Sequence, residues 1–236
     1  MGDRLTERDV STLRKQINNI EIINITDVNT SDFPKGGCWE RLLTIIDISN
    51  HHYVIQLDSD TITFSMPEEV MQCIVDNRSF TLGTEMGQKI ITFQEATKLL
   101  KDQGVNSQHV QVLAELSMAE IDHTNNLKYI RGCAAFTGFS KQGTSRDRVK
   151  NITQLIEQKI GENKWKEWGS EQVASNIAIA NSDGSLVLPI NKYHYFKPGI
   201  DANQFHLLHF VGSNRFTGGE YARLARKQVE ILKSSL

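Results

Sequence analysis

Apolar and polar residues alternate along the chain, and their spacing changes between a helical period and a strand-like period. Apolar residues three and four positions apart are typical of helices that bury one face. We predict helices at 6–17, 39–49, 93–100, 146–160, 171–180 and 220–232, and a further helix that starts at Pro67. Thr6 and Asp9 have the spacing of an N-terminal capping pair, which places the start of the first helix.

Short runs of apolar and β-branched residues between these segments predict strands. The predicted strands are 21–25, 53–57, 79–82, 129–131, 135–139, 186–188 and 207–211. Segment 53–57 is largely apolar, which favours a buried central strand. Segment 109–116 fits either a strand or a helix, and its composition favours a strand. Because strands alternate with helices and no long polar linker divides the chain, we predict one α/β domain over residues 1–236.

Composition and charge exclude several classes of protein. Hydrophobic residues make up 39% of the 236 residues and charged residues 23%, a balance that excludes a disordered or fibrous chain. The net charge of −2 leads us to expect no nucleic-acid partner. No apolar run approaches the roughly 18 residues of a membrane span, and the charged N-terminus has no apolar signal core. Cys38, Cys73 and Cys133 lack metal-site or disulfide spacing, which favours a reduced, cytoplasmic protein.

An acidic pair directly follows the predicted strand 53–57. Asp58 and Asp60 stand where α/β proteins bind ligands, outside the carboxyl end of a strand. Two carboxylates held there suit Mg²⁺ or Mn²⁺, which bind through carboxylates and substrate phosphates. A divalent cation would also relieve the repulsion between the two charges. The alternative is that both aspartates cap a solvated turn.

A histidine, a glycine and an arginine follow one another at spacings of three in the last predicted strand and the loop behind it. They are His209, Gly212 and Arg215. A neutral imidazole binds divalent ions, a glycine lets the backbone approach phosphate, and an arginine can neutralise a leaving group. The alternative is that His209 is a core histidine with local hydrogen bonds.

These two motifs resemble those of GT-A glycosyltransferases. The DxD motif of that family is matched by Asp58-Ser59-Asp60. The H-x-x-G-x-x-K segment of the glycogenin and lipopolysaccharide galactosyltransferase group is matched at His209 and Gly212, with Arg215 in place of the lysine. The resemblance implies a GT-A-like, Rossmann-like fold with a mixed central sheet. It also implies that Asp58, Asp60 and His209 hold Mn²⁺ or Mg²⁺ on the diphosphate of a nucleotide-sugar, and that Arg215 lies against that diphosphate.

Further segments resemble motifs of the same group of glycosyltransferases. Arg41 stands where its members carry an Arg-Leu pair that contacts the donor. Glu171 and Gln172, followed by Asn176, resemble the D-Q-x-x-x-N helix start beside the donor sugar, with Glu in place of Asp. The alternative there is a capping box around Ser170, which would make both side chains structural. Gly132 occupies the place of the N-x-G strand segment, where it permits close approach of a sugar or forms a simple bulge.

The N-terminal part of the resemblance is incomplete. GT-A domains open with a βαβ unit that holds the base and ribose, whereas here only the predicted strand 21–25 precedes the DxD strand. We therefore expect an N-terminally truncated domain that lacks one strand and one helix of that unit. Such a domain would expose a sheet edge that needs cover by a helix or a partner.

Aromatic residues near these motifs offer faces that could stack on sugar rings, although burial in the core is the usual role of tryptophan. The four candidates are Trp39, Trp165, Trp168 and Tyr221. The basic C-terminal helix has a solvated face as its default role and leaves peripheral membrane contact open.

The function expected from the sequence is metal-dependent transfer of a hexose from a nucleotide-diphosphate sugar to a saccharide or other hydroxyl acceptor. Glu171, Gln172 and Arg215 would be catalytic, and Arg41, Gly132 and Gly212 would complete the donor site. One alternative is a non-catalytic GT-A relative that binds a carbohydrate or a partner. A phosphoesterase or nucleotidyltransferase is a third, for which no second acidic cluster is found to complete a two-metal site.

Overall fold

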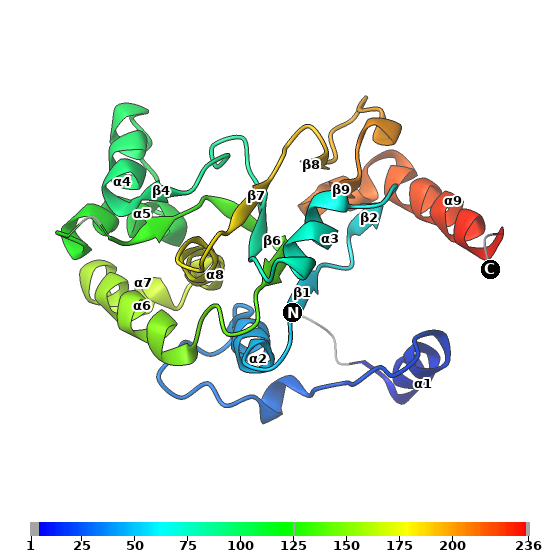
Figure 1. The fold of residues 1–236 in the computed structure, drawn as a ribbon, viewed down its shortest axis with the longest axis horizontal. Coiled ribbons are helices and arrows are strands. Elements are labelled where there is room, and N and C mark those ends of the chain that lie inside the picture. Colours follow the sequence, from blue (N-terminus) through cyan, green and yellow to red (C-terminus); the bar gives the residue numbers. More distant parts are fainter. Residues whose placement is uncertain (1–4, 125, 235–236) are drawn as a thin grey trace.

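A mixed four-stranded sheet forms the centre of the fold (Figure 1). The computed structural model describes residues 5–124 and 126–234. In spatial order the strands of this sheet are β1 (Val54–Leu57), β6 (Gly132–Phe139), β3 (Phe80–Gly83) and β7 (Leu186–Leu188). Strand β6 runs antiparallel to both of its neighbours, whereas β3 and β7 are parallel. The predicted α/β class and mixed sheet are therefore confirmed, and the arrangement is compatible with a single Rossmann-like domain.

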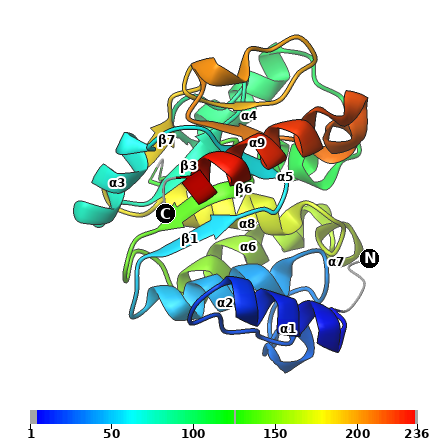
Figure 2. The same cartoon turned by 90° about the vertical axis from the view of Figure 1, so that its right-hand side faces the viewer.

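Helices cover one face of this sheet and build the largest core cluster (Figure 2). They are α2 (Trp39–Ser49), α6 (Arg146–Ile160) and α8 (Ser170–Ala180), with α4 (Phe93–Asp102), α5 (Val110–Ile121) and the short α7 (Glu162–Trp165) packed beside them. Helix α8 is buried along almost its whole length, so the residues of its first turn are held firmly against β6.

The opposite face carries α3 (Glu68–Val75) and a second sheet. The second sheet has the order β2 (Thr61–Thr63), β9 (Leu207–His209) and β8 (Tyr193–Tyr195). Strands β2 and β9 pair antiparallel, with Thr61 opposite His209, which brings the end of β9 to the start of β2. A two-stranded ribbon, β4 (Ile91–Thr92) with β5 (Lys128–Tyr129), lies beside α4.

The first and last helices extend from the body on the same side of the molecule (Figure 1). Helix α1 (Glu7–Gln16) begins with the predicted Thr6–Asp9 capping box and has no buried residue. Helix α9 (Glu220–Ser234) follows the 3₁₀ segment η3 (Gly212–Gly219) and buries only Leu224. No helix in the described part of the chain is both long and apolar enough to cross a bilayer.

Most predicted helices are confirmed to within two residues at each end. Helices α2, α6 and α8 have apolar residues that pack into the core, whereas the start of α1 follows from its capping box. The predicted strand 21–25 is wrong: this segment is irregular and ends in the 3₁₀ turn η1 (Ile25–Asp27). The Asn24 side chain accepts a hydrogen bond from the Thr26 amide, and Ile23 and Ile25 are exposed. With neither a buried face nor a pairing strand, the apolar run does not form a strand.

The preferred strand at 109–116 is also wrong, because helix α5 begins at Val110. The His109 ring accepts a hydrogen bond from the Gln111 amide and caps the helix. Gln111 donates to the buried carboxylate of Glu115 one turn later. Helical spacing thus pairs two buried polar side chains that a strand would place apart, which overrides the β-rich composition.

Strand β1 lies at an edge of its sheet rather than in the centre, so the prediction of a central buried strand is wrong. Within the described residues it pairs only with β6. Ile55 and Leu57 remain 41% and 55% exposed on one face, while Val54 packs into the core on the other. An apolar strand at an edge has the same sequence pattern as a central one, which is why the pattern misplaced it.

Candidate metal centre and binding cleft

One cleft of about 600 Å³ gathers most of the side chains that the sequence motifs singled out. Its walls come from the turn between β1 and β2, the first turns of α2, α5 and α8, the first half of β6, and the ends of β8 and β9. The candidate residues that line it are Arg41, Asp58, Asp60, Glu171, Gln172, His209, Gly212 and Arg215. Segments far apart in the sequence therefore converge on one depression.

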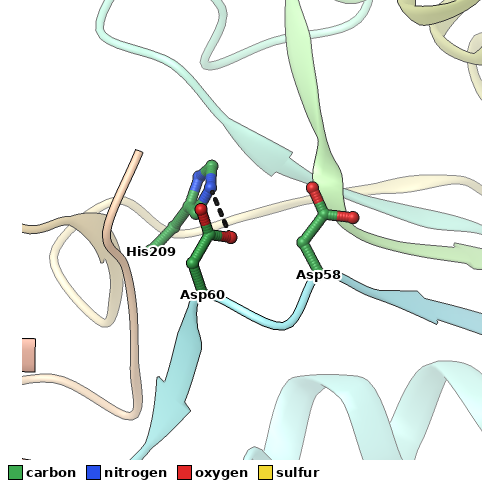
Figure 3. A group of neighbouring side chains, drawn as sticks. All are labelled: Asp58, Asp60 and His209. Carbon is green, nitrogen blue, oxygen red and sulfur yellow. Dashed lines mark ion pairs between the residues drawn. The ribbon is translucent and has the colours of Figure 1, made fainter. Parts of the chain in front are cut away.

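Asp58, Asp60 and His209 form a compact cluster of potential metal ligands (Figure 3). One donor atom from each residue lies within 4.8 Å of the donor atoms of the other two. Asp58 directly follows β1 and Asp60 directly precedes β2, so a tight turn separates them. Hydrogen bonds from the Asp58 amide to the Ala135 carbonyl and from the Phe210 amide to the Asp60 carbonyl, both 2.8 Å long, fix that turn between the two sheets.

The imidazole of His209 faces the aspartates from the buried end of β9. Its Nε2 lies 3.3 Å from Oδ1 of Asp60, and its Nδ1 lies 3.7 Å from Sγ of Cys133. Burial lowers the pKa of His209 and outweighs the opposing effect of the two aspartates. The ring is therefore neutral near pH 7, which is the form that binds a divalent ion.

Two guanidinium groups contact the acidic pair from different sides. Arg215 places Nη2 3.3 Å from Oδ2 of Asp60, while its Nε donates to the carbonyl of Gly212 at 2.9 Å. Gly212 has a φ of +59°, a conformation that favours glycine, and turns the chain at this point. Arg41 donates from Nη1 to Oδ1 of Asp58 at 2.7 Å. The cleft thus combines two carboxylates with two cations, an arrangement suited to a metal–phosphate ligand.

Glu171 and Gln172 reach the cleft from the first turn of α8. Oε1 of Glu171 lies 3.3 Å from Nη2 of Arg41, so one guanidinium joins this carboxyl to Asp58. Burial raises the pKa of Glu171 to about 7, and Arg41 opposes this effect only in part. Gln172 accepts a hydrogen bond from the Ala134 amide at 3.3 Å. A carboxyl of this pKa can exchange a proton near neutral pH.

The alternative of a capping box around Ser170 is wrong. The residue before the helix is Gly169, with a φ of +102° and no capping side chain. The Ser170 hydroxyl instead accepts a 2.9 Å hydrogen bond from the indole of Trp39 on α2. This buried bond ties the two helices that carry Arg41 and Glu171.

Gly132 lies outside the cleft lining. A Cβ at this position would come within 2.4 Å of Oγ1 of Thr81 and 3.0 Å of Oδ1 of Asn176, so the glycine permits close packing of β6 on β3 and α8. Asn176 donates from Nδ2 to the Gly132 carbonyl at 3.1 Å and is fully buried, outside the cleft lining.

The four aromatic candidates fall into different environments. Trp39 and Trp165 are fully buried in the core, where no sugar can reach them. The hydroxyl of Tyr221 donates to the Ser59 carbonyl at 2.6 Å and supports the turn between the aspartates. Only Trp168, among these four, is an exposed side chain that lines the cleft.

Among the lining residues that the sequence patterns did not assign to the site are His109, Gln111, Cys133 and Tyr195. His109 was missed because its segment had been predicted as a strand, so its position at a helix start was not foreseen. The Tyr195 ring packs on His209 with centroids 5.7 Å apart and limits the freedom of the imidazole.

Comparison with known proteins adds no assignment: no family model, curated protein or solved structure matches the chain.

Proposed function

We propose that the protein is a metal-dependent glycosyltransferase that moves a hexose from a nucleotide-diphosphate sugar to a saccharide or other hydroxyl acceptor. The observation that carries the proposal is the approach of Asp58, Asp60 and His209 within 4.8 Å, with Arg215 and Arg41 on the two carboxylates. A diphosphate bound through a divalent cation needs both kinds of group at one place.

The donor set of the cluster fits Mn²⁺ or Mg²⁺. Two carboxylates supply the hard oxygen ligands that both ions prefer, and a neutral imidazole is a ligand that Mn²⁺ accepts. Asp58, Asp60 and His209 would hold the ion. When bound, the ion would neutralise charge on the diphosphate and orient it as a leaving group.

The two arginines have separate roles in this proposal. Arg215 is half-exposed in the cleft lining, and its guanidinium contacts Asp60, one of the candidate metal ligands. It would bind phosphate oxygens and stabilise the charge that develops on the leaving diphosphate. Arg41 holds Asp58 and Glu171 together, so it would position one metal ligand and the side chain that faces the sugar.

Glu171 and Gln172 would orient the donor sugar through its hydroxyl groups. If the reaction retains the anomeric configuration, as in the resembled group, no strong general base is needed. If the reaction inverts it, Glu171 is the candidate base, because a pKa of about 7 allows proton transfer near neutral pH.

The proposal is tested by hydrolysis of nucleotide-diphosphate sugars with Mn²⁺, in the wild type and in Asp60→Asn. The substitution keeps the shape of the side chain but removes a ligand charge, and we expect it to abolish metal-dependent release of the nucleoside diphosphate. Asp47→Asn is the matched control, because Asp47 pairs with Arg146 at 2.7 Å outside the cleft. Equal turnover in all three proteins would contradict the proposed mechanism.

A non-catalytic binding module is the second candidate, because Arg41 and Arg215 pair with Asp58 and Asp60 and compensate the charge of both carboxylates. A thermal-shift series with Mn²⁺ and several nucleoside diphosphates separates the two candidates. Stabilisation that rises with ligand concentration supports the transferase, while a flat response to every pair supports the binding module.

A further inference from the structure

Trp168 exposes a large apolar ring in the cleft that holds the acidic cluster. Its side chain is 73% exposed, whereas Trp39 and Trp165 are 0% and 1% exposed. Burial of an indole ring stabilises a folded protein, so an exposed indole does not contribute this stabilisation. Exposed aromatic side chains are common where proteins bind ligands. Trp168 lines the same cleft as the Asp58–Asp60–His209 cluster, so a ligand that enters the cleft can cover it.

The backbone beside Trp168 is packed against neighbouring residues, and its ring contacts His109. Gly169 has a φ of +102°, and a Cβ there would lie 3.1 Å from Cε1 of His109. A Cβ on Gly37 would lie 3.8 Å from the Cα of Trp168. The rings of His109 and Trp168 meet edge to face, with centroids 6.3 Å apart and an interplanar angle of 80°. The contact with His109 leaves most of the surface of the indole open to a ligand.

Hydrogen-bonding groups line the same cleft as the indole. Nδ1 of His109 accepts from the Gln111 amide at 3.2 Å, so in the neutral ring the proton is on Nε2, which is free to donate. Glu171 and Gln172 follow Trp168 at the start of α8 and line the same cleft. An apolar face beside an imidazole, a carboxyl and an amide matches a pyranose ring, which has an apolar C–H face and a rim of hydroxyl groups.

The cleft has two ends of different chemistry. Arg41 contacts Asp58 with one nitrogen and Glu171 with another, and thereby joins the ends. Asp58, Asp60 and His209 form the anionic end, which suits a metal–diphosphate. Trp168 and His109, whose rings contact each other, form the aromatic end, and neither of them is an arginine or a lysine that could bind phosphate. The two ends are therefore suited to different parts of a reaction.

We propose that Trp168 and His109 form an acceptor subsite that stacks a pyranose ring of the saccharide. The assignment of this saccharide as the acceptor rests on the proposed transferase function. Trp168 covers the apolar face of the ring, His109 donates to a hydroxyl, and the acceptor hydroxyl is directed toward the sugar held by Glu171 and Gln172.

Tryptophan fluorescence tests saccharide binding without donor or metal. Because two of the three tryptophans are fully buried, quenching by acrylamide reports mainly on Trp168. Methyl pyranosides and disaccharides form one arm, and a nucleoside diphosphate forms the other. We expect saccharides to protect Trp168 from the quencher, and His109→Ala to weaken the protection. Protection by the nucleoside diphosphate alone, or by neither class of ligand, would overturn the subsite.

Kinetics of transfer to the protecting saccharide provide the second readout. We expect Trp168→Ala to raise KM for the saccharide roughly tenfold and to affect kcat less, with partial rescue by Trp168→Phe. Val75→Ala is the control, because Val75 is 77% exposed on α3 and lies outside the cleft. If Trp168→Ala leaves KM unchanged while metal-dependent donor hydrolysis is intact, the proposed subsite is contradicted but the proposed function is not. Absence of that hydrolysis in the wild type would instead contradict the proposed function.

Discussion

Arg41 donates a 2.7 Å hydrogen bond to Asp58, and this bond ties helix α2 to the turn that carries the acidic pair. The same guanidinium reaches Glu171 on α8, so three separate elements meet at one side chain. Both carboxyl groups therefore depend on Arg41 for their position and for compensation of their charge.

Replacement of Arg41 by alanine should lower kcat/KM for donor hydrolysis by about tenfold to a hundredfold, because both partners lose their orientation. Arg41→Lys should recover only part of the rate, since one ammonium group cannot reproduce the planar fork. Steady-state kinetics with Mn²⁺ measure the effect. Arg146→Ala is the control, because Arg146 has an ion pair of the same length with Asp47 outside the cleft. Equal losses in Arg41→Ala and Arg146→Ala would contradict a specific role.

Replacement of Arg215 by alanine should separate metal binding from turnover. The guanidinium lies 3.3 Å from Oδ2 of Asp60 and competes with a cation for that oxygen. We expect Arg215→Ala to bind Mn²⁺ at least as tightly as the wild type, but to lose about a hundredfold in kcat. Calorimetric titration with Mn²⁺, together with donor hydrolysis, measures both quantities. A parallel loss of metal affinity would show that Arg215 only supports the structure of the site.

Glu171 should make the stability of the metal-free protein depend on pH. Its pKa is about 7 in the folded protein and near the usual 4.5 after unfolding. Between these values the unfolded chain has released the proton while the folded chain retains it. The free energy of unfolding should therefore fall as pH rises through this window, by up to about 1.4 kcal/mol per pH unit from this group.

Glu171→Gln removes that titration, so its stability relative to the wild type should increase from about pH 4.5 to pH 7. Urea unfolding of both proteins at several pH values measures the difference, in which titrations common to both proteins cancel. A difference that stays constant with pH would mean that Glu171 ionises at its ordinary value.

The Trp39–Ser170 hydrogen bond should contribute to stability and to the placement of Glu171. Both residues are buried, so Trp39→Phe leaves the serine hydroxyl without its donor at a cost of about 1–3 kcal/mol. Urea unfolding of Trp39→Phe, Ser170→Ala and the double variant measures the coupling between the two side chains. Strictly additive losses would indicate that the bond contributes nothing beyond packing.

Sequence patterns predicted the helices better than the strands, and the reason is visible in particular elements. Helix α2 has a broad apolar face that spans several turns, so its bounds follow from periodicity alone. Strand β1 has four residues, and its edge position depends on which strands pair with it, which local sequence does not contain. Helix α5 was misassigned because its buried polar pair, Gln111 and Glu115, was not recognised as one turn of a helix.

The candidate site was predicted in part through motif resemblance rather than through periodicity. No local pattern places His209 beside Asp60; that proximity results from the pairing of β9 with β2. The sequence alone could not show that Gly132 does not line the cleft, because its role depends on contacts with Thr81 and Asn176, which lie on other elements. The exposure of Trp168, in contrast to Trp39 and Trp165, likewise depends on tertiary packing that no local pattern shows.

Anomalous diffraction from crystals grown with Mn²⁺ tests the central claim most directly. The account predicts one strong anomalous peak within about 2.0–2.6 Å of carboxylate oxygens of Asp58 and Asp60 and of Nε2 of His209. A peak elsewhere in the molecule, or a peak on the aspartates with His209 turned away, would contradict it.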